Sequence, residues 1–453
     1  MPAYNRLIKK FKSSSALQSG LALTVARSFL IASNFFIFFI LVRLCSPADF
    51  GTWILYSSIV VIFEVANNSF VSNAIVKYYH EYKDALRGVF IFNAFIFTIA
   101  LSLLFSVILY LSIHLINVIY HSNELNELLL LAPLILFASG LTNAFNCIEQ
   151  GNMRFYGQLV VSVVKSVVFI SYLLYLLITE TGYSLQNFVI VSIISGFLAL
   201  LIVYFLTLKF VIITRRFDFK MIQSIAKYGF FTFGIEVIGQ LSNNIGQLIA
   251  GALLSPAAVG IINVATRVLQ FIEIPLQAVS AVLMPQGVIT LKEKGMSGIK
   301  ALYEKSSAFI IVVMLPVLVL FFIFSDQVIY LIAGKDFHEA SLLLRIILVY
   351  SLFKPFGRNS GVILNAIGKT KINFFMVLIP TVINLLLNYY LIKKLGVVGS
   401  PIATLIATLV GFVFNQYVMY KIASINLKAI LVEARNFYQR FFNFLIVKSN
   451  QKA

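Results

Sequence analysis

The sequence predicts an all-α, polytopic membrane protein with twelve transmembrane helices in two six-helix lobes that are parallel repeats. Of its 453 residues, 60% are hydrophobic and 11% are charged, and the mean hydropathy is +0.95. Soluble domains carry about 25% charged residues. The apolar runs reach about 20 residues, enough to cross a hydrocarbon core of about 30 Å as a helix. An internal duplication is the third observation behind this fold class.

The duplication consists of nine residues that recur 209 positions later without a gap. The matched pairs are Gly20 and Gly229, Ser33-Asn34 and Ser242-Asn243, Leu44 and Leu253, Ser46-Pro47-Ala48 and Ser255-Pro256-Ala257, Gly51 and Gly260, and Glu64 and Glu273. Each half has an even number of spans, so both halves begin on the same side of the membrane. The repeats are therefore parallel, related by an axis along the membrane normal.

Six apolar runs lie in each half. They cover 17–43, 52–76, 88–119, 128–150, 157–178 and 187–212, then 226–254, 257–287, 305–333, 340–366, 372–392 and 397–422. Ser46-Pro47 and Ser255-Pro256 are predicted to form turns that cap the following helix. Prolines inside four spans are predicted to bend them: Pro275, Pro316, Pro355 and Pro380.

The predicted organisation is an N-terminal lobe over 1–212, a cytoplasmic connector over 213–225, a C-terminal lobe over 226–425 and a tail over 426–453. The tail has apolar residues at helical spacing, with Lys428, Arg435 and Arg440 elsewhere on the wheel. Each charge at the centre of a membrane span costs about 3 kcal/mol. An amphipathic helix on the cytoplasmic membrane surface avoids that cost.

The net charge of +18 orients the helices rather than marking a nucleic-acid partner. With the N-terminus placed inside, cytoplasmic segments hold 25 Lys and Arg residues and the outer loops hold 4. This positive-inside bias places both termini on the cytoplasmic side of the membrane. The expected location is a bacterial inner (plasma) membrane. Cys45 and Cys147 fall at opposite faces, so no disulfide is expected, and no metal or cofactor motif is present.

Ionisable residues inside spans are costly and usually face a partner or a wet cavity. Polar residues form three helical stripes: Glu236, Gln240, Asn243 and Gln247; Thr266, Gln270, Glu273 and Gln277; and Lys354, Arg358, Gly361 and Asn365. The cations suit phosphate oxygens, since Arg can bind two oxygens at once. The predicted substrate-binding set is Arg27, Arg267, Lys354, Arg358, Asn34, Asn243 and Gln270.

Three acids inside spans have two interpretations that the sequence leaves open. Glu64, Glu236 and Glu273 either pair with the buried cations or titrate with a coupling proton. For Lys165, Arg345 and Asp326, helix-holding or headgroup contacts are the favoured interpretation.

Several motifs resemble those of the Wzx-type polysaccharide flippases, a family of the multidrug/oligosaccharidyl-lipid/polysaccharide (MOP) exporter superfamily. They are Arg43-Leu-Cys-Ser-Pro-Ala-Asp-Phe-Gly51, Asn73-Ala-Ile-Val-Lys77, Leu331-Ile-Ala-Gly-Lys-Asp-Phe-His-Glu-Ala340 and Leu364-Asn-Ala-Ile-Gly-Lys-Thr-Lys371. The resemblance covers about residues 15 to 425.

The resemblance implies a V-shaped pair of six-helix lobes and no enzymatic activity. It implies that undecaprenyl-pyrophosphate-linked oligosaccharide is moved from the inner to the outer leaflet for surface polysaccharides such as O-antigen or lipopolysaccharide. Membrane lipids, a polymerase and other assembly proteins would be its partners. The alternatives are a multidrug or organic-cation antiporter of the same superfamily, and a membrane polysaccharide polymerase or ligase. The basic stripe disfavours the first, and the short outer loops disfavour the second.

Overall fold

A computed structural model of the chain describes residues 15–82, 84–152, 154, 156–211 and 213–450. These residues form helices and no strand, which confirms the predicted fold class. They divide into two compact units, Met1–Asn244 and Ile245–Ala453, and the boundary lies within helix α8 (Phe219–Leu253). The lobe, connector and tail boundaries expected from the duplication stay a prediction.

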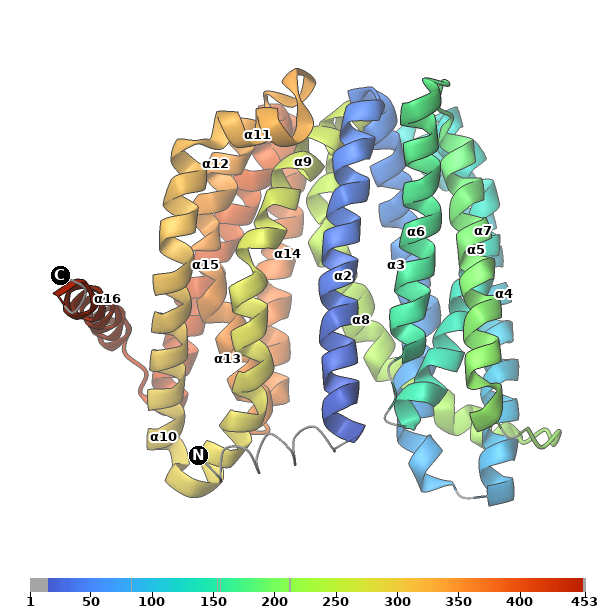
Figure 1. Ribbon diagram of the computed structural model, residues 1–453, viewed down its shortest axis with the longest axis horizontal. Coiled ribbons are helices and arrows are strands. Elements are labelled where there is room, and N and C mark those ends of the chain that lie inside the picture. Colours follow the sequence, from blue (N-terminus) through green and yellow to red (C-terminus); the bar gives the residue numbers. More distant parts are fainter. Residues whose placement is uncertain (1–14, 83, 153, 155, 212, 451–453) are drawn as a thin grey trace. The chain divides into compact units, whose positions relative to one another are not determined.

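The first unit is a bundle of upright helices (Figure 1). They are α2 (Ser15–Leu44), α3 (Pro47–Glu81), α4 (Asp84–Tyr120), α5 (Asn123–Gly151), α6 (Tyr156–Thr179), α7 (Leu185–Thr207), the 3-10 turn η1 (Leu208–Phe210) and most of α8. Each apolar run predicted in the first half coincides with one of the helices α2 to α7. The hydrophobic periodicity and length of these runs were sufficient to locate the helices.

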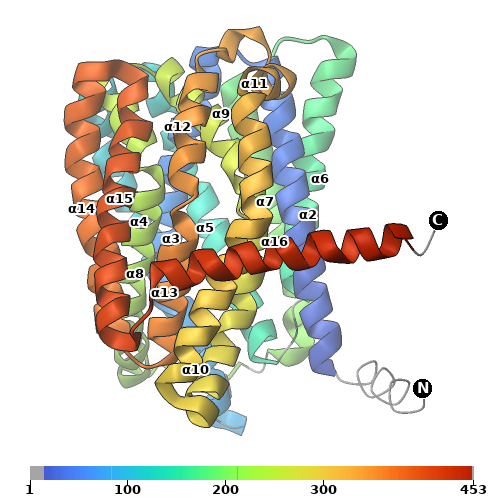
Figure 2. The ribbon, with the colours of Figure 1, turned by 90° about the vertical axis from the view of Figure 1, so that its left-hand side faces the viewer.

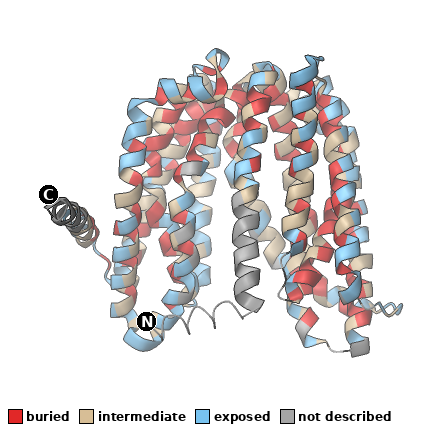
Figure 3. Ribbon diagram, viewed as in Figure 1, coloured by how far each residue is buried: buried red, intermediate tan, exposed pale blue. Residues whose placement is uncertain are grey.

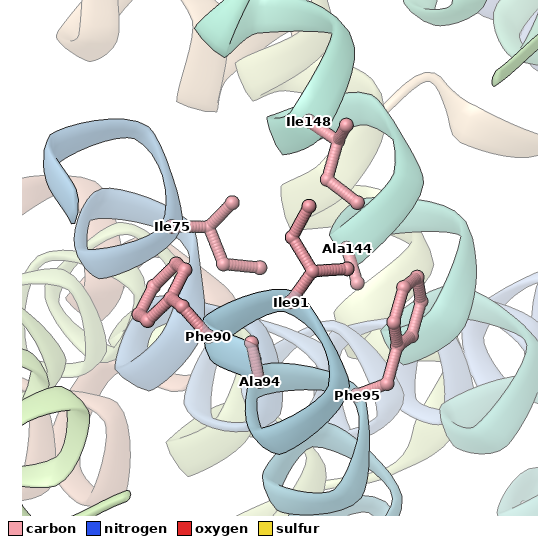
Figure 4. A pocket seen from close by; sticks show the side chains of 7 residues that line it. All are labelled: Ile75, Phe90, Ile91, Ala94, Phe95, Ala144 and Ile148. Atoms are coloured by element: carbon pink, nitrogen blue, oxygen red, sulfur yellow. The ribbon is translucent and has the colours of Figure 1, made fainter. Parts of the chain in front are cut away.

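The core of this unit lies between α3, α4 and α5. Figure 4 shows apolar side chains from the three helices converging on a crevice that leaves no room for a water molecule: Ile75, Phe90, Ile91, Ala94, Phe95, Ala144 and Ile148. Asn67 on α3 donates hydrogen bonds to Ser102 Oγ (3.0 Å) and to the Leu136 carbonyl (3.2 Å). Such polar contacts between helices suit a bundle whose surroundings supply no hydrophobic driving force.

The first half of α8 packs against α3, which explains why the unit boundary falls inside α8. Gly229 lies so close to α3 that a methyl group there would overlap the backbone carbonyl of Phe70. Thr232 donates a hydrogen bond to the Ser69 carbonyl (3.0 Å). The rings of Phe70 and Phe233 stack with their centroids 4.5 Å apart.

The second unit contains more helices than predicted spans, because several spans are broken. Its elements are α9 (Pro256–Ile272), α10 (Ile274–Ile323), α11 (Ser325–Ala333), the 3-10 turn η2 (Lys335–Phe337), α12 (Ala340–Ser351), α13 (Lys354–Ala366), α14 (Thr370–Leu395), the 3-10 turn η3 (Gly396–Val398), α15 (Gly399–Ala423) and α16 (Leu427–Asn450). Helix α10 turns back on itself at Gly295, whose φ of 60° is a left-handed conformation that glycine tolerates. The predicted spans 257–287, 305–333 and 340–366 are each built from two helices.

Seven helical stretches of the described residues are long and apolar enough to cross a membrane, or nine if each of two bent pairs is one span. Large apolar side chains remain exposed on them, including Leu111 on α4, Ile178 on α6 and Val413 on α15. Buried, half-buried and exposed residues alternate along the helices (Figure 3). This pattern fits a bundle surrounded by lipid. The count of twelve spans stays a prediction.

Both predicted helix caps are present. Ser46 Oγ accepts a hydrogen bond from the Asp49 N–H (3.2 Å), and Ser255 Oγ accepts one from the Ala258 N–H (3.3 Å). Of the four span prolines, Pro275 and Pro355 each lie in the first turn after a helix break. Helices α10 and α14 continue through Pro316 and Pro380.

The tail contains the helix α16, which lies across α10 within the second unit (Figure 2). The Asn426 N–H donates to Glu304 Oε1 (3.1 Å), and the Tyr438 hydroxyl donates to the Val312 carbonyl (2.9 Å). Ile430 and Ala434 are buried against α10, whereas Leu431 and Val432 are exposed. The position of this helix on the cytoplasmic membrane surface stays a prediction.

Candidate functional site

Two helix breaks in the second unit position a charged residue each. Glu273 lies between α9 and α10, two residues before Pro275. Lys354 begins α13 and is followed at once by Pro355, where α12 and α13 meet at a bend of 44°. Proline lacks an N–H and its ring clashes with the carbonyl four residues earlier, so it interrupts a helix at this point. The sequence thus places one charge at each interruption.

The two breaks are joined by an ion pair. Lys354 Nζ lies 2.5 Å from Glu273 Oε1, and their side chains are 32% and 19% exposed. The same ammonium lies over the ring of Tyr350, 5.4 Å from its centroid, in a cation–π arrangement. Tyr350 is buried. The lysine is therefore held between a carboxylate and an aromatic face, while part of it stays accessible.

Arg358 lies one helical turn after Lys354 and adds a second cation to this cluster. Its Nε donates a hydrogen bond to Ser280 Oγ (3.2 Å) on α10, and its side chain is exposed. Residues four apart on a helix share a face. Lys354 and Arg358 are therefore both placed on the side of α13 that contacts the α9–α10 break.

Arg267 makes a separate contact on α9. Its Nη1 donates a hydrogen bond to Gln270 Oε1 (3.2 Å), so these two predicted site residues do meet. Arg267 is half-buried and Gln270 is exposed. The contacts described here join Glu273, Lys354 and Arg358 with Ser280, and join Arg267 with Gln270.

The remaining predicted site residues lie in the first unit. Asn34, Asn243 and Glu236 are exposed, and Glu64 is half-buried beside Lys165 and Ser139. The side chain of Arg27 lies outside the described residues. Asp326, Arg345 and Ser325 form a compact ion pair and hydrogen bond, with Arg345 Nη2 lying 2.6 Å from Asp326 Oδ2. This contact agrees with a helix-holding role.

Sequence reasoning missed Tyr350 and Ser280. A signal existed for each. Tyr350 precedes Lys354 by four residues, the spacing at which side chains on a helix meet. Ser280 continues the stripe of Thr266, Gln270, Glu273 and Gln277 by one further step. In the part of the chain that is described, no group of three His, Cys, Asp or Glu residues could hold a metal ion.

A protein family described as "Polysaccharide biosynthesis protein" matches residues 40–342. The chain belongs to this family. One relative is the "Probable low-salt glycan biosynthesis flippase Agl15" of Haloferax volcanii, 24% identical over 47% of this chain and 45% of that protein. Another is the "Amylovoran biosynthesis protein AmsL" of Erwinia amylovora, 23% identical over 38% and 44%. The matches span less than half the length of these relatives.

Solved structures with the same fold are membrane transporters. "Lipid II flippase MurJ, inward closed conformation" is 18% identical, with a TM-score of 0.77 over 94% of this chain and 92% of that one. An inward-facing multidrug resistance MATE family transporter of the MOP superfamily is 19% identical, with a TM-score of 0.70 over 86% and 95%. The chain therefore has the fold of MOP-superfamily transporters, as the resemblance implied.

Proposed function

We propose that this protein is a flippase that moves polyprenyl-pyrophosphate-linked oligosaccharide units from the cytoplasmic to the outer leaflet of a cell membrane. The undecaprenyl carrier is the specific form that we propose. Alternating access of the two repeats would carry the headgroup. The family and the fold support a transporter in polysaccharide assembly. The observation that carries the proposal is the pair of cations, Lys354 and Arg358, held at the joined helix breaks.

A pyrophosphate headgroup needs converging cations because moving it out of water is costly. An uncompensated ion in an apolar medium costs many kcal/mol. Lys354 and Arg358 lie one turn apart on the same face of α13, and Arg can present two donors to one phosphate. Both side chains remain partly or largely exposed within an otherwise apolar bundle. This arrangement suits an anion that must be bound and then released.

Glu273 makes the site exchangeable. Without substrate, its carboxylate neutralises Lys354 at 2.5 Å, which limits the cost of holding the ammonium inside the bundle. A diphosphate entering the site would compete with Glu273 for Lys354 and Arg358. A ligand shifts a conformational equilibrium only through contacts that differ between two states. The ion pair joins the α9–α10 and α12–α13 breaks. Replacing Glu273 by a diphosphate as the partner of Lys354 would therefore change the contacts at the points where the helices bend.

The competing function is export of organic cations, since a MATE transporter shares the fold. A fold alone does not decide between these substrates. The exposed side chain of Arg358 next to Lys354 favours an anionic ligand. The lipid-linked substrate and the membrane are the partners that this proposal requires, and a polymerase receiving the flipped unit is part of the same proposal.

The test is a flipping assay in proteoliposomes with a fluorescent undecaprenyl-pyrophosphate oligosaccharide, read by its accessibility to an impermeant reagent. We expect Lys354→Gln and Arg358→Gln each to lose about 2 kcal/mol of substrate interaction, or roughly 30-fold in flipping efficiency. Lys371→Gln, an exposed lysine at the start of α14, is the matched control and should flip normally. Full activity of the double variant would refute the proposal. Export of cationic dyes by the wild type without lipid flipping would establish the alternative.

A further inference from the structure

The two legs of α10 enclose a groove of about 480 Å³ within the second unit. One leg contributes residues before the Gly295 turn and the other contributes residues after it: Val279, Val282, Leu283 and Gln286, then Leu302, Lys305, Ser306 and Phe309. On both legs the lining residues recur every three or four positions, so each leg presents one continuous face. The volume lies in the range of ligand-binding pockets.

The polar residues of the groove are confined to its half nearer the Gly295 turn, and its other end is apolar. Gln286, Lys305 and Ser306 lie on the parts of the two legs nearer the Gly295 turn, where Leu302 also lines the groove. Val279, Val282 and Phe309 lie farther from the turn, and Val282 and Phe309 are exposed. An ammonium beside a strip of exposed apolar side chains matches a molecule with an anionic head and a hydrocarbon tail.

The surroundings of the polar end favour an anionic ligand. Residues 292–305 contain four lysines and two glutamates. One of these acids, Glu304, already accepts a hydrogen bond from the Asn426 backbone. The positive-inside bias predicts that this turn faces the cytoplasm, where a phospholipid headgroup would meet Lys305 and its acyl chain would run toward the bilayer centre.

We propose that this groove binds one anionic phospholipid of the cytoplasmic leaflet, with its phosphate on Lys305 and an acyl chain along Val282 and Phe309. Helix α16 borders the apolar end, because Phe437 packs edge-on against Phe309 with the ring centroids 6.0 Å apart. The bound lipid would therefore connect the α10 hairpin to α16. Neither the proposed flippase activity nor the ion-pair site requires this ligand.

The groove is separate from the cation cluster on the same helix. At 3.6 residues per turn, Ser280 points roughly 110° away from the centre of the face formed by Val279, Val282, Leu283 and Gln286. Ser280 contacts Arg358, whereas the groove opens on the other side of this leg. Substitutions in the groove and in the cluster can therefore be tested independently.

The experiment is native mass spectrometry of the purified full-length protein, titrated with phosphatidylglycerol, with phosphatidylcholine of the same chains, and with undecaprenyl phosphate. We expect Lys305→Gln to weaken phosphatidylglycerol binding at least tenfold without changing phosphatidylcholine binding. Lys292→Gln, which removes a lysine outside the groove, should change neither. Val282→Trp should reduce retention of both phospholipids by filling the apolar end.

If Lys305→Gln and Lys292→Gln weakened phosphatidylglycerol binding equally, the binding would depend on general surface charge, and the proposal would be overturned. If Lys305→Gln abolished undecaprenyl phosphate binding and left phosphatidylglycerol binding unchanged, the groove would be assigned to the carrier lipid and the proposal would also be overturned. Lys354→Gln with Arg358→Gln should keep phosphatidylglycerol binding while losing flipping. Failure of the lipid-site proposal can therefore be distinguished from failure of the flippase proposal. A thermal unfolding curve confirms that each variant is folded.

Discussion

Each of the two matched glutamates faces a lysine, but the lysines come from different helices. Glu64 on α3 lies beside Lys165 on α6, whereas Glu273 pairs with Lys354 on α13. The positions offset by 209 residues from these lysines carry no charge: Lys165 corresponds to Phe374, and Lys354 corresponds to Phe145. The acid is therefore shared by the repeats, and its cation is specific to each.

Both corresponding positions hold an uncharged phenylalanine, so the pairing of each glutamate could not be deduced from its copy. Lys354 and Glu273 are also 81 residues apart in the chain. Hydrophobic periodicity predicted the helix faces that carry them. Only the tertiary fold shows which cation meets which acid.

A residue-scale prediction concerns Tyr183, which links the α6–α7 loop to the start of α3. Its hydroxyl donates to Asp49 Oδ2 (2.5 Å) and accepts from the Ser46 N–H (3.0 Å). A hydrogen bond to a charged group that is partly exposed contributes about 1 kcal/mol. Tyr183→Phe should therefore lower the thermal unfolding temperature in detergent. Tyr175→Phe, at an exposed tyrosine on α6, should leave it unchanged.

The stabilisation by the Tyr183 hydroxyl should be lost at high pH. Burial, and then the bond to Asp49, raises the pKa of Tyr183 above its ordinary value. A group whose pKa is raised by folding contributes its full stability below the unfolded pKa of about 10, and loses it as pH rises through the folded pKa. The stability difference between wild type and Tyr183→Phe should stay constant from about pH 6 to 9 and shrink above about pH 10. A stability difference that grows at high pH would contradict the role of the Tyr183 hydroxyl as a hydrogen-bond donor to Asp49.

At the scale of elements, local signals predicted more than the positions of the helices. The Ser-Pro turns predicted both caps, because a serine oxygen satisfies an unpaired N–H of the first helical turn. The prolines indicated where bends could form. Pro355 is at a break and Pro380 is within a continuous helix, and the sequence around them does not distinguish the two. Neighbouring helices decide whether the freed backbone groups are satisfied in place.

The close contact between α3 and α8 at Gly229 predicts how alanine substitutions on α8 affect stability. Gly229→Ala should destabilise the first unit by about 1–3 kcal/mol, because the added methyl group overlaps the Phe70 carbonyl and rigid backbone cannot yield easily. Gly234→Ala lies on the same helix with nothing within 4 Å of the added group, and should be neutral or slightly stabilising. The measurement is the thermal unfolding temperature of both purified variants. Equal behaviour of the two would contradict the packing described here.

At the scale of the whole molecule, composition and charge predicted a polytopic helical protein, and the fold confirms its class. The two legs of α10 correspond to parts of the predicted spans 257–287 and 305–333, but the exact turn was not predicted, because Gly295 and Gly298 both lie in the polar segment between them. The boundary between the two compact units lies inside α8. It depends on packing against α3, which is a long-range contact.

The predicted topology can be measured by cysteine labelling with an impermeant maleimide in intact cells. Single cysteines at Asn123 and Gly182 should label from outside, and one at Lys294 only after permeabilisation, because the positive-inside bias places it in the cytoplasm. All three positions are exposed or at an exposed turn. The native Cys45 and Cys147 are buried and would be replaced by alanine in the labelling background. Labelling of Lys294→Cys from outside would reverse the proposed orientation.

We propose that Lys354 is a substrate-binding cation, which Glu273 neutralises until the substrate enters. The most direct measurement compares flipping and thermal stability for Lys354→Gln, Glu273→Gln and the exchanged pair Glu273→Lys with Lys354→Glu. The exchange keeps opposite charges facing each other but removes the cation from α13 beside Arg358. We predict that the exchanged pair recovers part of the thermal stability lost in the single variants and recovers no flipping. Recovery of flipping together with stability would show that the ion pair only holds helices together, and would contradict a substrate-binding role for Lys354.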